Sequence, residues 1–221
     1  EASHYKFAGR GGFEPAPGVH VIPIPDPVAG VHRGSDSGPL YVAEIQSILD
    51  RLAAEGRAPF AMLAEAIIGC GGQVVPPKGY LRGAFEAVQA AGGLAIADEV
   101  QVGFGRVGSH FWAFETQSVL PDIVVLGKPI GNGHPMAAVI TTREIADSFA
   151  DAGMEFFSTF GGNPVSCAAA LAVLSIPLLV TDSVAGLFAV VLVLGFAVAP
   201  YMISVFMLGE KASPPARVGT A

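Results

Sequence analysis

Two short apolar runs, each followed by a reactive side chain, constrain the fold of this chain most strongly. Residues 94–97 are followed by Asp98 and Glu99, and residues 123–126 are followed, after one glycine, by Lys128. Such runs are typical of strands buried in a parallel sheet. The segment between them is long enough for the crossover that parallel strands require. The sequence therefore predicts an acid and an amine at the carboxyl ends of the strands, where open α/β sheets bind ligands.

A lysine and a carboxylate in this arrangement suit one kind of cofactor. The amine of Lys128 is able to form a Schiff base with an aldehyde, and the carboxylate of Asp98 is able to keep a pyridine nitrogen protonated. Pyridoxal phosphate requires both groups. The alternative is that Lys128 is an ordinary surface lysine after a strand.

The remaining pattern predicts strands that alternate with helices. Apolar residues at helical spacing indicate helices over residues 40–57 and 78–91, and a strand begins after Pro59. This alternation favours an α/β fold with a mainly parallel sheet and helices on both faces.

Two further helices are predicted from capping residues near the end of this region. Thr141 with Glu144 indicates a capping box for a short helix that ends near Ala150. Asn163 and Pro164 suit the N-cap and first turn of a helix that runs to Leu174.

Three separated segments resemble the class III (ornithine/omega) aminotransferases, which depend on pyridoxal phosphate and have fold type I. The segments are ADEVQVGFGR at 97–106, LGKPIGNGHP at 126–135 and FFSTFGGNP at 156–164. Residues 153–174 and the early segment with GVHVIPIPDP are most similar to the branch that holds alanine:glyoxylate aminotransferase-like proteins and ethanolamine-phosphate phospho-lyases. The resemblance implies that residues 1–174 are part of a fold type I large domain.

The resemblance also implies roles for particular residues. Lys128 would form the Schiff base and move the substrate proton. Asp98 would pair with the pyridine nitrogen, Val100 would pack on the ring, and Gln101 would bond to the ring hydroxyl. Thr159 would reach across a homodimer to the partner's cofactor phosphate.

Glu65 is similar to a family glutamate near the substrate pocket. Its surroundings differ from the family pattern, because Ala66 and Ile68 replace the usual proline or serine and glutamine. The resemblance implies a central fragment of such an enzyme. The loop that binds the cofactor phosphate would lie upstream, and the small domain with its carboxylate-binding arginine would lie downstream.

The composition changes after Leu174. Residues 184–208 contain no charged side chain and are numerous enough to span a hydrocarbon core of about 30 Å. Residues 197–221 resemble a segment of the major facilitator transporters. We therefore expect residues 175–221 to be a foreign tail with a transmembrane candidate at 184–208, from a fusion or an artefact. The alternative is a buried helix that extends the one beginning at Pro164.

Charge and cysteine content exclude other classes of function. A net charge of −7 without a basic stripe argues against nucleic acid binding. Cys70 and Cys167 form no CxxC motif and the histidines lack ligand spacing, so we expect no metal site and a reduced, cytoplasmic enzyme. The letters GFGRVG at 103–108 match a dinucleotide motif, but the required strand and helix do not flank them directly.

The sequence thus predicts a pyridoxal-phosphate-dependent transaminase that moves an amino group from an amine or amino acid to an oxo acid. Two alternatives stay open. One is a phospho-lyase that acts on O-phosphoethanolamine-like substrates, and the other is an inactive truncated or fused fragment. Membrane association would come only through the tail.

Overall fold

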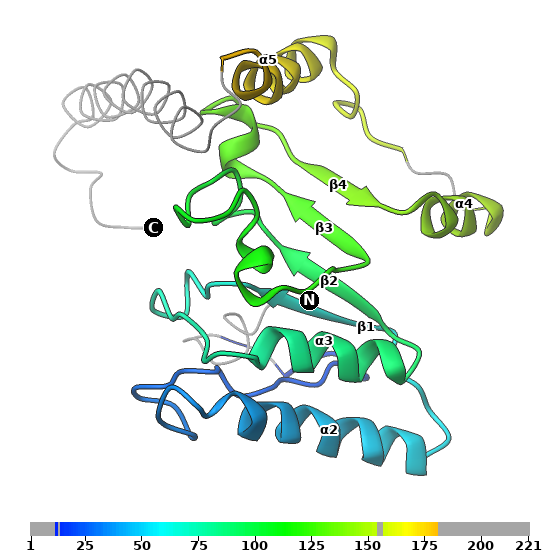
Figure 1. The fold of residues 1–221 in the computed structure, drawn as a ribbon. Helices are drawn as coiled ribbons and strands as arrows, with labels where there is room; N and C mark the ends of the chain where they lie inside the picture. Colours follow the sequence, from blue (N-terminus) through cyan, green and yellow to red (C-terminus); the bar gives the residue numbers. More distant parts are fainter. Residues whose placement is uncertain (1–11, 13, 154–156, 181–221) are drawn as a thin grey trace, which may run out of the picture. The chain divides into compact units, whose positions relative to one another are not determined.

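The computed structural model describes residues 12, 14–153 and 157–180. Its elements are α2 (Gly38–Ala54), β1 (Ala61–Glu65), α3 (Tyr80–Ala90), β2 (Leu94–Asp98), the 3-10 helix η1 (Ala113–Gln117), β3 (Ile123–Leu126), the 3-10 helix η2 (Lys128–Gly131), β4 (Ala138–Thr141), α4 (Arg143–Asp151) and α5 (Pro164–Val180), as drawn in Figure 1. The chain divides into two compact units. The first holds residues 1–127 and 138–157, and the second holds residues 128–137 and 158–221.

The four strands form one sheet in the order β1-β2-β3-β4 (Figure 1). β1 pairs with β2 and β2 with β3 in parallel, so the predicted parallel core of the sheet is confirmed. β4 was not predicted, and it pairs with β3 in the antiparallel direction. Residues 127–137 connect β3 to β4, and they contain the short 3-10 helix η2 rather than the crossover α-helix that usually joins parallel strands.

The core of the first unit lies between the sheet and two helices. α3 packs on β1 and β2, and α2 packs on α3 (Figure 1). Leu81 and Phe85 on α3 are fully buried, as is Ala95 on β2. Alternate residues of the strands point to the opposite face of the sheet. On that face Leu63 remains 50% exposed and Val139 64% exposed, so the expected helix cover of both faces is not seen at these positions.

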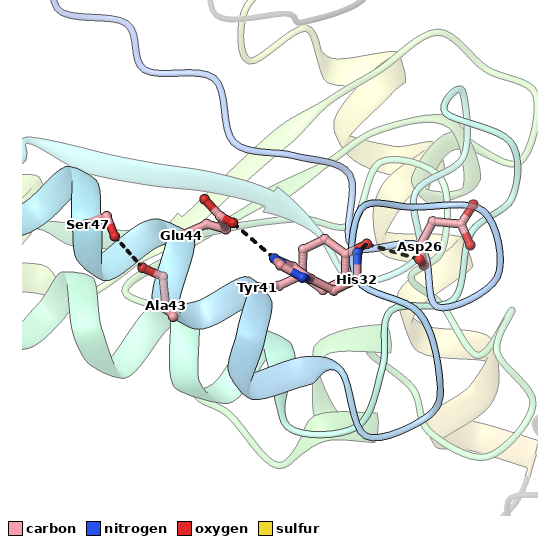
Figure 2. Close-up of polar contacts among 6 residues, drawn as sticks. All are labelled: Asp26, His32, Tyr41, Ala43, Glu44 and Ser47. Atoms are coloured by element: carbon pink, nitrogen blue, oxygen red, sulfur yellow. Dashed lines mark hydrogen bonds and ion pairs between the residues drawn. The ribbon is translucent and has the colours of Figure 1, made fainter.

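A network around Tyr41 fixes the loop that precedes α2. The buried Tyr41 hydroxyl donates to the Asp26 carbonyl at 3.0 Å and accepts from the His32 amide at 3.2 Å. The His32 ring Nε2 lies 3.0 Å from a Glu44 carboxylate oxygen. Figure 2 draws this contact beside the Tyr41 hydroxyl. These bonds attach the loop to the first turns of the helix.

The two predicted helix starts had different outcomes. α4 begins one residue later than the sequence suggested, because Thr142 is its N-cap and accepts from the Ile145 amide at 3.3 Å. Thr141 instead ends β4, and its hydroxyl donates to the Asp122 carbonyl, so the Thr141–Glu144 capping box was wrong. The prediction for Asn163 is confirmed, since its side-chain oxygen accepts from two amides in the first turn of α5.

α5 continues to Val180, six residues beyond the predicted end at Leu174. Within the stretches of chain that the structure describes, no helix has the length and apolar character needed to cross a bilayer. The transmembrane candidate at 184–208 and the transporter-like residues 197–221 lie outside the described residues. The division of the chain at 174/175 stays a prediction.

Candidate active site

Two carboxylates lie side by side at the carboxyl ends of β1 and β2. Glu65 is the register partner of Asp98, and Asp98 is in turn the partner of Val125 on β3. Partners on neighbouring strands point to the same face of a sheet. Glu65, Asp98 and Val125 therefore form a row on one face of the sheet. This face is opposite α3, because Ala97, the residue before Asp98, points into the core.

The loop after β1 brings Gln101 to the same place. Glu65 Oε2 accepts a hydrogen bond from the Gly69 amide at 2.8 Å. A Cβ at Gly69 would lie 2.8 Å from Gln101 Nε2 and 3.3 Å from Glu65 Oε2. Gly69 is buried, and its lack of a side chain leaves room for the Gln101 amide. Three of the predicted site residues, Glu65, Asp98 and Gln101, thus surround the ends of two adjacent strands.

Val100 lies against the backbone just before the lysine. The Asp98 carboxylate accepts from the Val100 amide at 3.0 Å, which fixes the start of the turn after β2. A Cβ at Gly127 would lie 3.0 Å from Val100 Cγ1. Glycine at 127 therefore lets the Val100 side chain pack directly on the chain between β3 and Lys128.

Lys128 is exposed and has an unusual backbone conformation. Its φ is +28°, a region that residues with a Cβ avoid. It opens η2, in which Pro129 and Ile130 are buried, and η2 packs against α5. His134 Nε2 and Ser166 Oγ, 2.8 Å apart, join the following loop to α5. Such sparsely populated backbone conformations often occur at functional sites. Positive φ is also found at Gln73, Phe104, Ser118 and Asn132.

The structure distributes the predicted residues over its two units. Glu65, Asp98, Val100 and Gln101 belong to the first unit, whereas Lys128 and the exposed Thr159 belong to the second. Along the chain Lys128 comes two residues after Leu126, the last residue of β3.

The glycine-rich run 103–108 forms successive turns, and a 3-10 helix rather than an α-helix follows at Ala113. This geometry agrees with the expectation that the run is not a dinucleotide motif.

Sequence reasoning missed the role of Glu99. Its side chain is fully buried, and its two oxygens accept from the amides of Ala113 and Phe114, each at 2.9 Å. Burial raises the pKa of this carboxyl, and the two amide hydrogen bonds oppose the rise. Strand alternation was the available signal, since two consecutive acids at a strand end must point to opposite faces.

Comparison with known proteins shows the family of the chain. The family model described as aminotransferase class-III matches residues 4–180. The chain belongs to the class III aminotransferases.

Two curated relatives and one solved structure show which members of this family the chain is similar to. It is 51% identical over 181 residues to an alanine–glyoxylate aminotransferase 2-like protein of Drosophila melanogaster, covering 80% of this chain and 37% of the relative. It is 42% identical over 189 residues to ethanolamine-phosphate phospho-lyase homolog 1 of Caenorhabditis elegans, with 80% and 40% covered. Among solved structures, a phospholyase from Arthrobacter in complex with phosphoethanolamine has a TM-score of 0.59 and 42% identity, with 70% of this chain and 36% of that one covered. The chain thus spans well under half the length of these relatives.

Proposed function

We propose that this chain is part of a pyridoxal-phosphate-dependent enzyme that moves an amino group from an amine or amino acid to an oxo acid. The observation that carries the proposal is the pairing of Asp98, at the end of β2, with Val125 of β3, the strand that leads into Lys128. Class III aminotransferases use this cofactor. The donor set fits, because it offers an amine, a carboxylate and an amide at or just after strand ends.

Each residue has a proposed task. When bound, the cofactor would supply an electron-withdrawing ring that makes the substrate carbon acidic. Lys128 would hold the cofactor covalently and, once released by substrate, would move the proton to and from that carbon. Asp98 would keep a proton on the pyridine nitrogen, Gln101 would donate to the ring hydroxyl, and Val100 would pack on the ring face.

Two more assignments extend the proposal beyond the ring. Glu65, whose Oε2 is already bonded to the Gly69 amide, would border the substrate pocket with its remaining acceptor capacity. Thr159 would bind the cofactor phosphate of a second copy in a homodimer. We also propose a cytoplasmic location for the enzyme portion, with any membrane contact through the tail.

A reduction experiment tests the assignment of the lysine. Borohydride converts a lysine–cofactor linkage into a stable secondary amine, so peptide mapping of the reduced protein identifies the residue. We expect the pyridoxyl group on Lys128, because the bound cofactor would be held next to that amine. Equal labelling of the exposed Lys78 would contradict specific binding and support an inactive fragment.

The phospho-lyase alternative is favoured by the similarity to the Caenorhabditis and Arthrobacter proteins. In that reaction the base removes a proton from the carbon bearing nitrogen, the β-phosphate leaves with its bonding electrons, and water releases an aldehyde and ammonia. A full-length protein carrying this sequence should be incubated with O-phosphoethanolamine. Phosphate release without an oxo acid would establish the lyase reaction, whereas amino transfer that requires an oxo acid would establish the transaminase.

Gly69→Ala tests whether Gln101 contributes to cofactor binding. The new methyl group would mainly displace the far end of the flexible Gln101 side chain, so we expect a stability loss of about 1 kcal/mol, at the lower end of the range for an added methyl group. We expect the dissociation constant for pyridoxal phosphate to rise about tenfold, because one hydrogen bond to the ring hydroxyl would be lost. Absorbance titration measures the constant, and Cys70→Ala, at the exposed next position, is the control. An unchanged constant in Gly69→Ala would remove Gln101 from the site.

A further inference from the structure

Glu99 occupies the junction between the strand that carries Asp98 and the turn that carries Val100 and Gln101. Its amide donates to the Val125 carbonyl at 2.9 Å, which extends the pairing of β2 and β3 one residue past Asp98. Its carbonyl accepts from the Gly103 amide at 3.2 Å and closes the turn over residues 100–103. The main chain of this residue therefore fixes both the end of the strand and the turn that follows it.

The Glu99 side chain makes a third connection, on the opposite face of the sheet from Asp98. Each carboxylate oxygen accepts one amide of η1, from Ala113 and from Phe114. η1 also has a local cap, because Glu115 Oε2 accepts from the Trp112 amide at 2.8 Å. The bonds to Glu99 differ from this cap in that they connect η1 to a distant part of the chain.

Burying a carboxylate raises the free energy of the folded state more than burying an apolar side chain would. Desolvation of a charged group destabilises the folded state unless hydrogen bonds compensate for it. Here both compensating donors are backbone amides in a fixed geometry, and Gly103 leaves space for the carboxylate. A Cβ at Gly103 would lie 3.1 Å from the Glu99 carbonyl oxygen, 3.2 Å from Glu99 Oε2 and 3.2 Å from a ring atom of Trp112.

We propose that Glu99 is a positioning residue for the cofactor-binding end of β2. Through its two bonds to η1 it holds the backbone of Asp98 and of residues 100–103 in place, so that the Asp98 carboxylate and Gln101 keep a fixed direction. The inference rests on the proposed function only for what those two side chains bind. The connection itself is a property of the chain without ligand.

The connection is tested first by amide hydrogen exchange on the chain without ligand. Glu99→Gln keeps the shape of the side chain but turns an NH₂ group toward one of the two amides. We expect exchange about tenfold faster at Ala113 and Phe114, and also at Val100 and Gly103. The matched control is Glu115→Gln, which keeps an acceptor for Trp112 and should leave Val100 and Gly103 unchanged. A change confined to Ala113 and Phe114 would overturn the inference.

The consequence for the cofactor is tested by titrating pyridoxal phosphate. Trp112 is the only tryptophan of the chain, and it packs on Phe104 and Phe111, so its fluorescence reports on this region. We expect the dissociation constant to rise about tenfold in Glu99→Gln and less than about twofold in Glu115→Gln. A wild-type constant in folded Glu99→Gln would overturn the inference. Absence of binding by the wild type would contradict the proposed function instead, and the exchange result would still decide whether the connection exists.

Gly103→Ala provides a second variant that does not depend on the folding of Glu99→Gln. The added methyl group presses on both the carbonyl and the carboxylate of Glu99 and on the Trp112 ring, and it leaves the charge in place. We expect faster amide exchange at Ala113 and Phe114, and a higher dissociation constant for pyridoxal phosphate, as in Glu99→Gln. If exchange at Ala113 and Phe114 rises while the constant does not, the positioning role is excluded.

Discussion

Lys128→Ala is expected to abolish the absorbance band of lysine-bound pyridoxal phosphate. The band requires a covalent bond between the cofactor and an amine, and alanine has no group that can form one. Residual binding through Asp98 and Gln101 would be noncovalent and reversible on dialysis. Spectrophotometric titration of wild type and variant measures the difference. A band of equal intensity in the two proteins would refute the assignment of Lys128.

The structure offers two controls for this experiment. Lys78→Ala removes an exposed lysine and should leave the band unchanged. Lys128→Gly should lose the band as completely as Lys128→Ala, and we expect it to be more stable by about 1 kcal/mol, since glycine adopts positive φ without the cost that a Cβ imposes. If the glycine variant is no more stable in urea, the backbone of Lys128 is not strained in solution.

The backbone conformation of Lys128 lowers the stability of the fold, and the lysine side chain at this position supplies the reactive amine of the proposed site. Glycines stand on both sides of this segment, at positions 127 and 131. A glycine at position 128 would also suit the positive φ of the backbone there. The chain has a lysine there instead, followed by buried residues that hold η2 in place. Proteins accept such local costs where a side chain must be presented in one direction.

The parallel strands were predictable because their signal is local. The run before Asp98 and the run before Lys128 are apolar, short and bounded by glycine or proline, and the strands β2 and β3 appear where these patterns indicate. The register of these two strands then pairs Asp98 with Val125 at their carboxyl ends. β4 was missed because only four residues form it, and its pairing with β3 depends on how the loop over residues 127–137 folds.

The contacts of the candidate site depend on residues that are distant in sequence. Nothing near Gly69 in the sequence indicates that Gln101 packs on it, because loop closure after β1 decides that contact. The bonds from Glu99 to Ala113 and Phe114 likewise span more than a dozen residues. Only the opposite directions of Asp98 and Glu99 were available from strand periodicity.

Phe85→Ala is expected to destabilise the chain by about 3–5 kcal/mol, the range found when a large buried aromatic side chain is removed. Phe85, on α3, is fully buried and belongs to the hydrophobic core cluster. The same core cluster contains the strand residues Ala95 and Ala97, whose methyl groups are too small to fill the space that the ring would leave. Urea denaturation, followed by the circular dichroism of α2 and α3, measures the loss.

Phe60→Ala is the matched control, because it makes the same substitution one residue before β1 at a side chain that is 86% exposed. We expect a change within about 0.5 kcal/mol, as is usual for surface positions. Equal losses in the two variants would mean that Phe85 is not in the core, and the packing of α3 on β1 and β2 would then be wrong. Since that packing assigns Ala97 to the covered face, it also assigns Asp98 to the open one, and the candidate site would fail with it.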